Sequence, residues 1–186
     1  APSLAVSGDN LFRFLPDDTN QAEAVANLMW EDGIRAVIPI WRGDVWGDGL
    51  SQPTKDNFEV LGGVILDGVR YSPATEDFST DIESLSIKVD QAAAQYGVDA
   101  VAVHLMAFEE VVSIFTEAQN YNGLSSVKWY GSDGTALSRG LSTDGEAAQF
   151  AIKTGYPNPI LGEALADISS LLPETLERIG LEHLIY

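Results

Sequence analysis

Short apolar runs alternate with amphipathic stretches along most of the chain. Apolar runs of the kind found in strands buried on both faces occur at four places: 36–41, 64–71, 99–105 and 127–130. Apolar residues at helical spacing lie before and between them and predict helices over about 20–32, 49–61, 78–96 and 109–120. Repeated strand–helix alternation is typical of an α/β fold with a doubly wound, mostly parallel sheet and helices on both faces.

Some segments carry more specific expectations. Pro39 cannot donate a ladder hydrogen bond, so a bulge or an unpaired position is expected within its strand. Leu11 to Leu15 is interpreted as a short strand or connector, and the apolar face of the first helix is expected to hold Leu28 as well as Ala22, Val25, Ala26 and Met29. A small helix at 143–149, an extended segment at 150–156 and a helical segment at 161–186 interrupted at Pro173 complete the pattern.

The charge balance narrows the function classes. The 186 residues hold 28 Asp and Glu against 10 Lys and Arg, a net charge of −18. Such a surface repels phosphate backbones and anionic lipid, so no nucleic acid partner is expected. The absence of cysteine excludes disulfides, thiolate metal sites and cysteine nucleophiles. No apolar run is long enough to span a membrane, and no basic-then-apolar leader opens the chain.

In open parallel sheets, ligands bind at the carboxyl ends of the strands. This rule selects three predicted loops: 42–49, 106–109 and 131–134. Enzyme chemistry has little support there, because the nucleophile elbow, the Walker loop and the dinucleotide fingerprint are all missing. His104 lies in a predicted buried strand, where a hydrogen-bonded core histidine is a better interpretation than a catalytic base. We therefore expect no catalytic residues and no cofactor.

The acidic pairs could in principle bind a metal such as Ca²⁺, but the EF-hand spacing is not met. Helix capping is the favoured interpretation for Asp17 and Asp18, and a solvated loop for Asp44 and Asp48, so no metal site is predicted. Asp133, which lies between close glycines, is equally well interpreted as a turn residue or as a ligand contact.

Several segments, in this order and spacing, resemble the second lobe of type I periplasmic solute-binding proteins, of the branched-chain amino acid and amide receptor type. They are FRFLPDD at 12–18, VWGDGL at 45–50, GGV at 62–64, the loop from Pro73 to Phe78, VDAV at 98–101 and WYGSDG at 129–134. The resemblance covers about residues 11–165. No single motif is highly specific, and the evidence is their combination.

The resemblance implies a receptor of an ABC importer that captures a small, amino-acid-like solute by closing two lobes, and not an enzyme. Trp46 would form an aromatic wall and Asp133 would bind the solute's ammonium group, with Ser132 beside it. A second aromatic position maps to Ala107 or Phe108, while Asp44 contacts either the solute or only water. The family commonly has Tyr and Glu in place of Trp46 and Asp133, which leaves open a solute other than a branched-chain amino acid.

The resemblance also suggests how the chain is organised. Residues 1–10 would be the tail of a first lobe and its crossover, 11–165 the second lobe, and 166–186 a segment returning toward the first lobe. An extracytoplasmic location follows, with the signal sequence upstream and an ABC permease as partner of the full-length protein. The exposed cleft face could pair with a second copy. The alternative is a ligand-sensing domain of a signalling receptor with the same fold.

Overall fold

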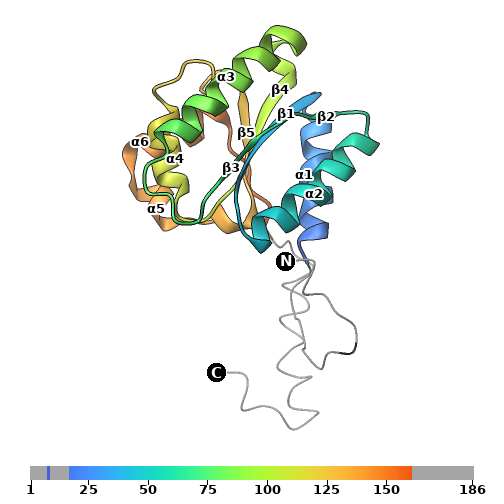
Figure 1. The fold of residues 1–186 in the computed structure, drawn as a ribbon, viewed down its shortest axis with the longest axis horizontal. Helices are drawn as coiled ribbons and strands as arrows, with labels where there is room; N and C mark the ends of the chain where they lie inside the picture. The colour runs from blue at the N-terminus through green and yellow to red at the C-terminus, as the bar shows by residue number, and fades with distance from the viewer. Residues whose placement is uncertain (1–7, 9–16, 161–186) are drawn as a thin grey trace.

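The computed structural model describes residue 8 and residues 17–160 (Figure 1). The connector predicted at 11–15, the segment at 161–186 and nearly all of residues 1–10 lie outside the described residues. The strands are β1 (Ala36–Arg42), β2 (Val64–Ile65), β3 (Val69–Tyr71), β4 (Val101–Met106) and β5 (Lys128–Tyr130). The α-helices are α1 (Asp18–Glu31), α2 (Val45–Val60), α3 (Ser79–Tyr96), α4 (Val111–Ala118), α5 (Arg139–Thr143) and α6 (Gly145–Thr154).

All the described strand pairs are parallel, in the order β2–β1–β4–β5, with β3 extending the β2 edge along β1. Helices α1 and α2 pack on one face of the sheet, while α3, α4 and α6 cover the other (Figure 1). The fold predicted from the alternating pattern is therefore confirmed, including the burial of β1 and β4 on both faces.

Pro39 marks an irregularity in the sheet, as its missing N–H predicts. On one side β1 pairs with β4 without interruption, and Pro39 lies opposite His104. On the other side, pairing stops after Val37↔Ile65 and resumes at Ile40↔Val69, so residues 38–39 face three residues, 66–68, of the neighbouring chain. The bulge lies in the neighbouring strand, splitting the predicted strand 64–71 into β2 and β3.

Helix α1 shows how the local pattern determines packing. The Asp17 side chain accepts a hydrogen bond from the Thr19 amide at 2.9 Å and caps the helix, as expected for this residue. The predicted apolar face is buried, except that Leu28 is 38% exposed. In α3, likewise, Ile87 is exposed, whereas Ile82 and Leu85 are buried.

Two predicted boundaries are wrong. Helix α2 begins at Val45, not at residue 49 or 50, so most of the predicted 42–49 loop is helical. Residues 150–154, expected to be extended, belong to α6, which ends at a left-handed Gly155. In both places a local pattern misled the interpretation: glycines and acids suggested a loop, and alternating large residues suggested a strand.

Candidate functional site

The sheet order creates a topological switch point at the carboxyl end of β1. The chain leaves β1 toward the β2 edge, whereas β4 lies on the opposite side of β1. The segments that follow β1 and β4 therefore diverge, and such a switch point is the usual ligand position in this architecture. Trp46, in the first turn of α2, and Phe108, just after β4, lie on these two segments.

Trp46 and Phe108 are in direct contact. Their rings stack with centroids 4.3 Å apart and planes inclined by 25°. Trp46 also packs against the buried Leu50 and Met106, while Phe108 keeps 39% of its surface exposed. Together they form an apolar surface at the switch point. One side of this surface packs on buried residues, and the other is partly exposed to solvent.

Arg42, the last residue of β1, connects the two segments that carry these aromatics. Its Nε donates to Asp44 Oδ2 at 2.6 Å and its Nη1 to Glu110 Oε1 at 3.0 Å. The guanidinium also lies 5.6 Å from the centroid of the Phe108 ring. The Tyr71 hydroxyl donates to the same Glu110 oxygen at 2.9 Å, and burial together with Glu110 raises the pKa of Tyr71, so it remains a donor.

Asp44 is the N-cap of α2 and not part of a solvated loop. Its Oδ1 accepts from the amides of Trp46 and Gly47 at 3.1 and 3.0 Å. Burial opposes ionisation of Asp44, but the Gly47 amide and Arg42 outweigh it and lower its pKa. A Cβ on Gly47 would lie 2.0 Å from the Arg42 carbonyl oxygen, so only glycine permits this close entry into the helix.

Asp48 was also expected to be solvated, but it forms an ion pair. Arg70 donates to both of its oxygens at 2.8 Å, and Trp41 Nε1 donates to Oδ1 at 2.9 Å. The Arg70 hydrogen bonds lower the pKa of Asp48 to about 2. Arg42, the last residue of β1, and Arg70, in β3, therefore already have carboxylate partners.

The loop after β5 brings Asp133 to the same carboxyl end of the strands. Asp133 begins a short 3-10 turn in which Thr135 N–H bonds to the Ser132 carbonyl at 3.1 Å. A Cβ on Gly134 would lie 2.5 Å from the Ala107 carbonyl oxygen and 2.8 Å from the Phe108 ring, so this turn packs directly on the segment that carries Phe108. The Asp133 side chain is exposed.

The six residues predicted for the site thus lie on the segments that follow β1, β4 and β5, but they differ in exposure. Ala107 and Ser132 are fully buried and offer no side-chain surface to a solute. Trp46, Phe108, Asp44 and Asp133 are partly or fully accessible. The sequence interpretation missed Arg42, Glu110 and Tyr71, whose ion pair and hydrogen bonds appear only once β1, β3 and β4 lie side by side.

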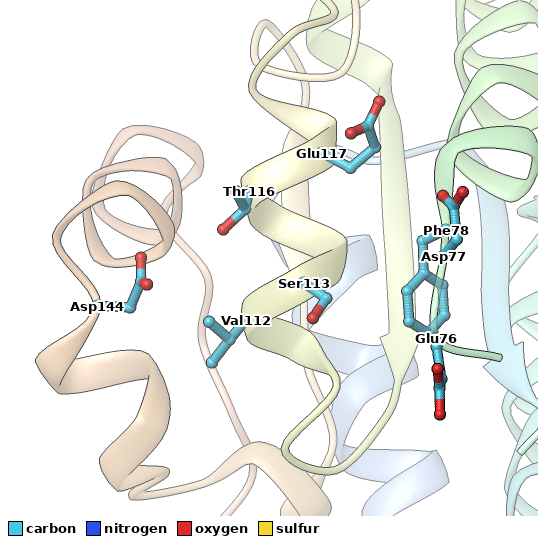
Figure 2. Close-up of a pocket in the computed structure, with 8 residues that line it drawn as sticks. All are labelled: Glu76, Asp77, Phe78, Val112, Ser113, Thr116, Glu117 and Asp144. Atoms are coloured by element: carbon cyan, nitrogen blue, oxygen red, sulfur yellow. The ribbon is translucent and has the colours of Figure 1, made fainter. Parts of the chain in front are cut away.

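A separate hollow of about 430 Å³ lies on the sheet face covered by α3 and α4, between the start of α3, α4 and the α5–α6 junction (Figure 2). Its polar lining is dominated by carboxylates, among them Glu76 and Glu117. Asp77 accepts from the Ser79 amide and Asp144 caps α6, so these two acids serve local structure. None of the six predicted site residues lines it.

His104 is buried in β4, as predicted, although neither ring nitrogen has a hydrogen-bond partner of normal geometry. Burial lowers its pKa to about 4, and the nearby Gly131 backbone offsets only part of that effect. Across residue 8 and residues 17–160, no three His, Asp or Glu side chains gather in a way that could hold a metal ion. Within the same residues, no helix is long and apolar enough to cross a membrane.

This parallel sheet with helices on both faces is similar to solved structures of periplasmic binding proteins and is one lobe of a type I periplasmic-binding-protein fold. Residues 2–158 match the family model described as the receptor family ligand binding region, and the chain belongs to that family. The family consists of ligand-binding proteins and receptors.

Individual proteins and solved structures are also similar to this chain. An uncharacterized protein of Methanocaldococcus jannaschii is 32% identical over 129 residues, which are 69% of this chain and 30% of that protein. A structure described as a branched-chain amino acid ABC transporter from Rhodospirillum rubrum matches with a TM-score of 0.59 and 23% identity, over 73% of this chain and 36% of that one. The leucine-binding protein LivK of Thermotoga maritima matches with a TM-score of 0.53 and 20% identity, over 70% and 34%. The chain thus spans about a third of the length of these relatives.

Proposed function

We propose that this chain is the second lobe of an extracytoplasmic solute-binding protein of an ABC importer, which captures a small, amino-acid-like solute. One observation carries the proposal. The Trp46–Phe108 stack and Asp133 both lie at the carboxyl end of the strands, at the switch point of the sheet. An apolar wall next to a carboxylate is the arrangement that suits an amine carrying an apolar group.

The charged residues near the switch point favour a solute that carries a cationic group. Arg42 and Arg70 are each paired with carboxylates, so neither is free to bind a solute carboxylate. Asp133 is exposed and has no ion-pair partner among the described residues. In this proposal the ammonium group binds Asp133 and the apolar part lies on Phe108 and Trp46, while Asp44 acts through the position of Trp46.

The proposal includes the rest of the receptor. Residues 11–165 form the second lobe, and residues 1–10 and 166–186 lead to a first lobe that supplies the contacts for the other end of the solute. A solute that bridges both lobes stabilises the closed form by its greater affinity for that form, and an ABC permease then recognises it. In the isolated lobe the exposed surface around Phe108 is available to a second copy, which light scattering at increasing concentration would detect.

A thermal-shift screen of the full-length gene product tests this function. The panel contains the protein L-amino acids, their amides and small carboxylates. A solute that binds only the folded state stabilises it by about 2.7 kcal/mol at a hundredfold excess over its dissociation constant. We expect a shift with at least one α-amino acid in the unmodified protein and its loss in Asp133→Ala. Shifts with carboxylates or neutral amides alone would discard the role of Asp133, and no shift at all would favour the signalling-domain alternative.

A further inference from the structure

Asp133 is held from a distant part of the chain. Gln21, on the first turns of α1, donates from Nε2 to Asp133 Oδ1 at 2.9 Å, and its Oε1 accepts the Asp133 amide N–H at 3.2 Å. The two residues are 112 positions apart in the sequence. One side-chain amide thus binds both the carboxylate and the backbone of the same residue.

The orientation of this amide is determined by its partners. The Gln21 NH₂ group also donates to Asp18 Oδ1 at 2.9 Å, so two carboxylate oxygens face the donor end. The carbonyl end faces an N–H group. Reversing the amide would place acceptor against acceptor and donor against donor, so a single orientation satisfies all three contacts.

The turn itself does not depend on Gln21. Backbone hydrogen bonds from Thr135 N–H to the Ser132 carbonyl and from Ala136 N–H to the Asp133 carbonyl, both at 3.1 Å, close it. Gly134 packs it against Ala107 and Phe108. What Gln21 adds is the direction of the Asp133 carboxylate, because it engages Oδ1 and leaves Oδ2 without a hydrogen bond to a described residue on an exposed side chain.

We propose that Gln21 is a positioning residue of the solute site: it binds Asp133 Oδ1 and the Asp133 amide, so that Oδ2 is directed toward the ammonium group of the solute. This inference rests on the proposed role of Asp133. These contacts require the amide group of glutamine. A glutamate of the same shape has no donor and would repel both Asp18 and Asp133.

The test compares Gln21→Ala and Gln21→Glu with the unmodified full-length gene product. Calorimetry uses the L-amino acids of the panel and, for each that binds, the same acid without its amino group. Loss of a hydrogen bond to a charged group is expected to weaken amino acid binding about tenfold in Gln21→Ala. Binding is expected to weaken further in Gln21→Glu, while binding of the deaminated acid stays unchanged. Gln52→Ala is the matched control, because Gln52 is also a helical glutamine whose amide donates to an aspartate, Asp56.

Amide hydrogen exchange provides a readout without solute. Exchange at Asp133 is expected to accelerate in both Gln21 variants, while exchange at Thr135 and Ala136 stays unchanged, which separates positioning from general loss of structure. Normal amino acid affinity or unchanged Asp133 exchange in Gln21→Ala would overturn the role of Gln21 alone. A wild-type protein that binds no amino acid would instead overturn the role of Asp133, and this inference with it.

Discussion

Trp46 and Phe108 stack at 4.3 Å although they follow different strands, β1 and β4. The contact joins the segments after β1 and β4 at the switch point, where the chain reverses its direction of winding. Arg42 lies against Phe108 and binds Asp44, which caps the helix that carries Trp46. The aromatic surface and the ion-pair network beneath it therefore form one structural unit.

Phe108→Ala should weaken this unit measurably. A stacked aromatic pair contributes about 0.5–1.5 kcal/mol beyond the area it buries, so the free energy of unfolding should fall by about 1 kcal/mol or slightly more. Removal of the ring should also expose Trp46 and lower solute affinity. Urea denaturation measures the free energy of unfolding, and tryptophan emission measures the exposure of Trp46. Phe108→Tyr keeps the ring and serves as control; an alanine variant that retains both stability and affinity would contradict the importance of the stack.

Arg42→Met should cost more than the loss of an ordinary surface ion pair. The substitution keeps most of the side-chain length but leaves Asp44 and Glu110, both half-buried, without their cation. We expect the free energy of unfolding to fall by about 1–3 kcal/mol, because charged groups lose hydrogen bonds in a partly desolvated place.

Lys55→Met is the control for Arg42, since Lys55 forms an exposed pair with Glu59 on α2. That pair should contribute less than about 0.5 kcal/mol. Chemical denaturation of both variants checks the difference. Equal losses would mean that the Arg42 network contributes no more than an ordinary surface pair, and that something else keeps Trp46 and Phe108 in place.

The sequence predicts the buried layers of this fold well and its helix starts less well. β1 and β4 are recognisable because strands covered on both faces need continuous apolar runs. The start of α2 was missed because Gly47 and Gly49 suggest a loop. The structure shows why Gly47 is helical: Asp44 caps its amide, and no Cβ fits against the Arg42 carbonyl.

For the candidate site, the sequence predicts which loops carry it but not the contacts between its residues. The carboxyl-end rule and the family resemblance selected Trp46, Phe108 and Asp133, which all lie at the switch-point edge. Their supporting residues were not predictable, because Gln21 contacts Asp133 across 112 positions and no periodicity or spacing relates the two. Such long-range polar pairs are set by how α1 packs beside β5, which appears only in the folded structure.

Acid should destabilise the fold through His104. Burial lowers its pKa to about 4, against 6.5 for the free side chain, so the unfolded chain binds the proton more readily. The contribution of uncharged His104 to the free energy of unfolding is therefore fully present above pH 6.5. It is lost as the pH falls toward 4, by about 3 kcal/mol in total. The ion pair of Asp48, whose pKa is about 2, is lost only below pH 4 and does not overlap.

Urea denaturation at several pH values between 7 and 4 measures this effect. His104→Leu removes the titrating group and should flatten the pH dependence in that interval while remaining folded at pH 7. Any pH dependence of stability that remains in the variant comes from other titrating groups. An identical slope in the variant and the unmodified chain would show that the pKa of His104 is not lowered in the native protein.

Salt should stabilise the chain, because its charge is strongly one-sided. The 28 acidic residues of the chain outnumber its ten basic residues. Among the described residues, five basic side chains form ion pairs with six acidic ones, so most of the acidic residues there have no ion-pair partner. The Debye length falls from about 10 Å at 0.1 M to about 3 Å at 1 M salt, which weakens the repulsion between these exposed acids more than the close, partly buried pairs. The melting temperature should therefore rise with NaCl, by about 2–4 °C for each kcal/mol of repulsion removed.

A variant with three exposed acids neutralised tests the cause of that rise. Glu23, Glu83 and Asp99 are exposed, lie on different elements and form no ion pair with another described residue. Glu23→Gln, Glu83→Gln and Asp99→Asn together should therefore raise the melting temperature at low salt and reduce its dependence on NaCl. Sucrose, which carries no charge, should stabilise both proteins equally. If the salt slope were unchanged in the triple variant, the stabilisation would come from preferential exclusion of salt from apolar surface, and the acidic surface would contribute little to the balance of folding.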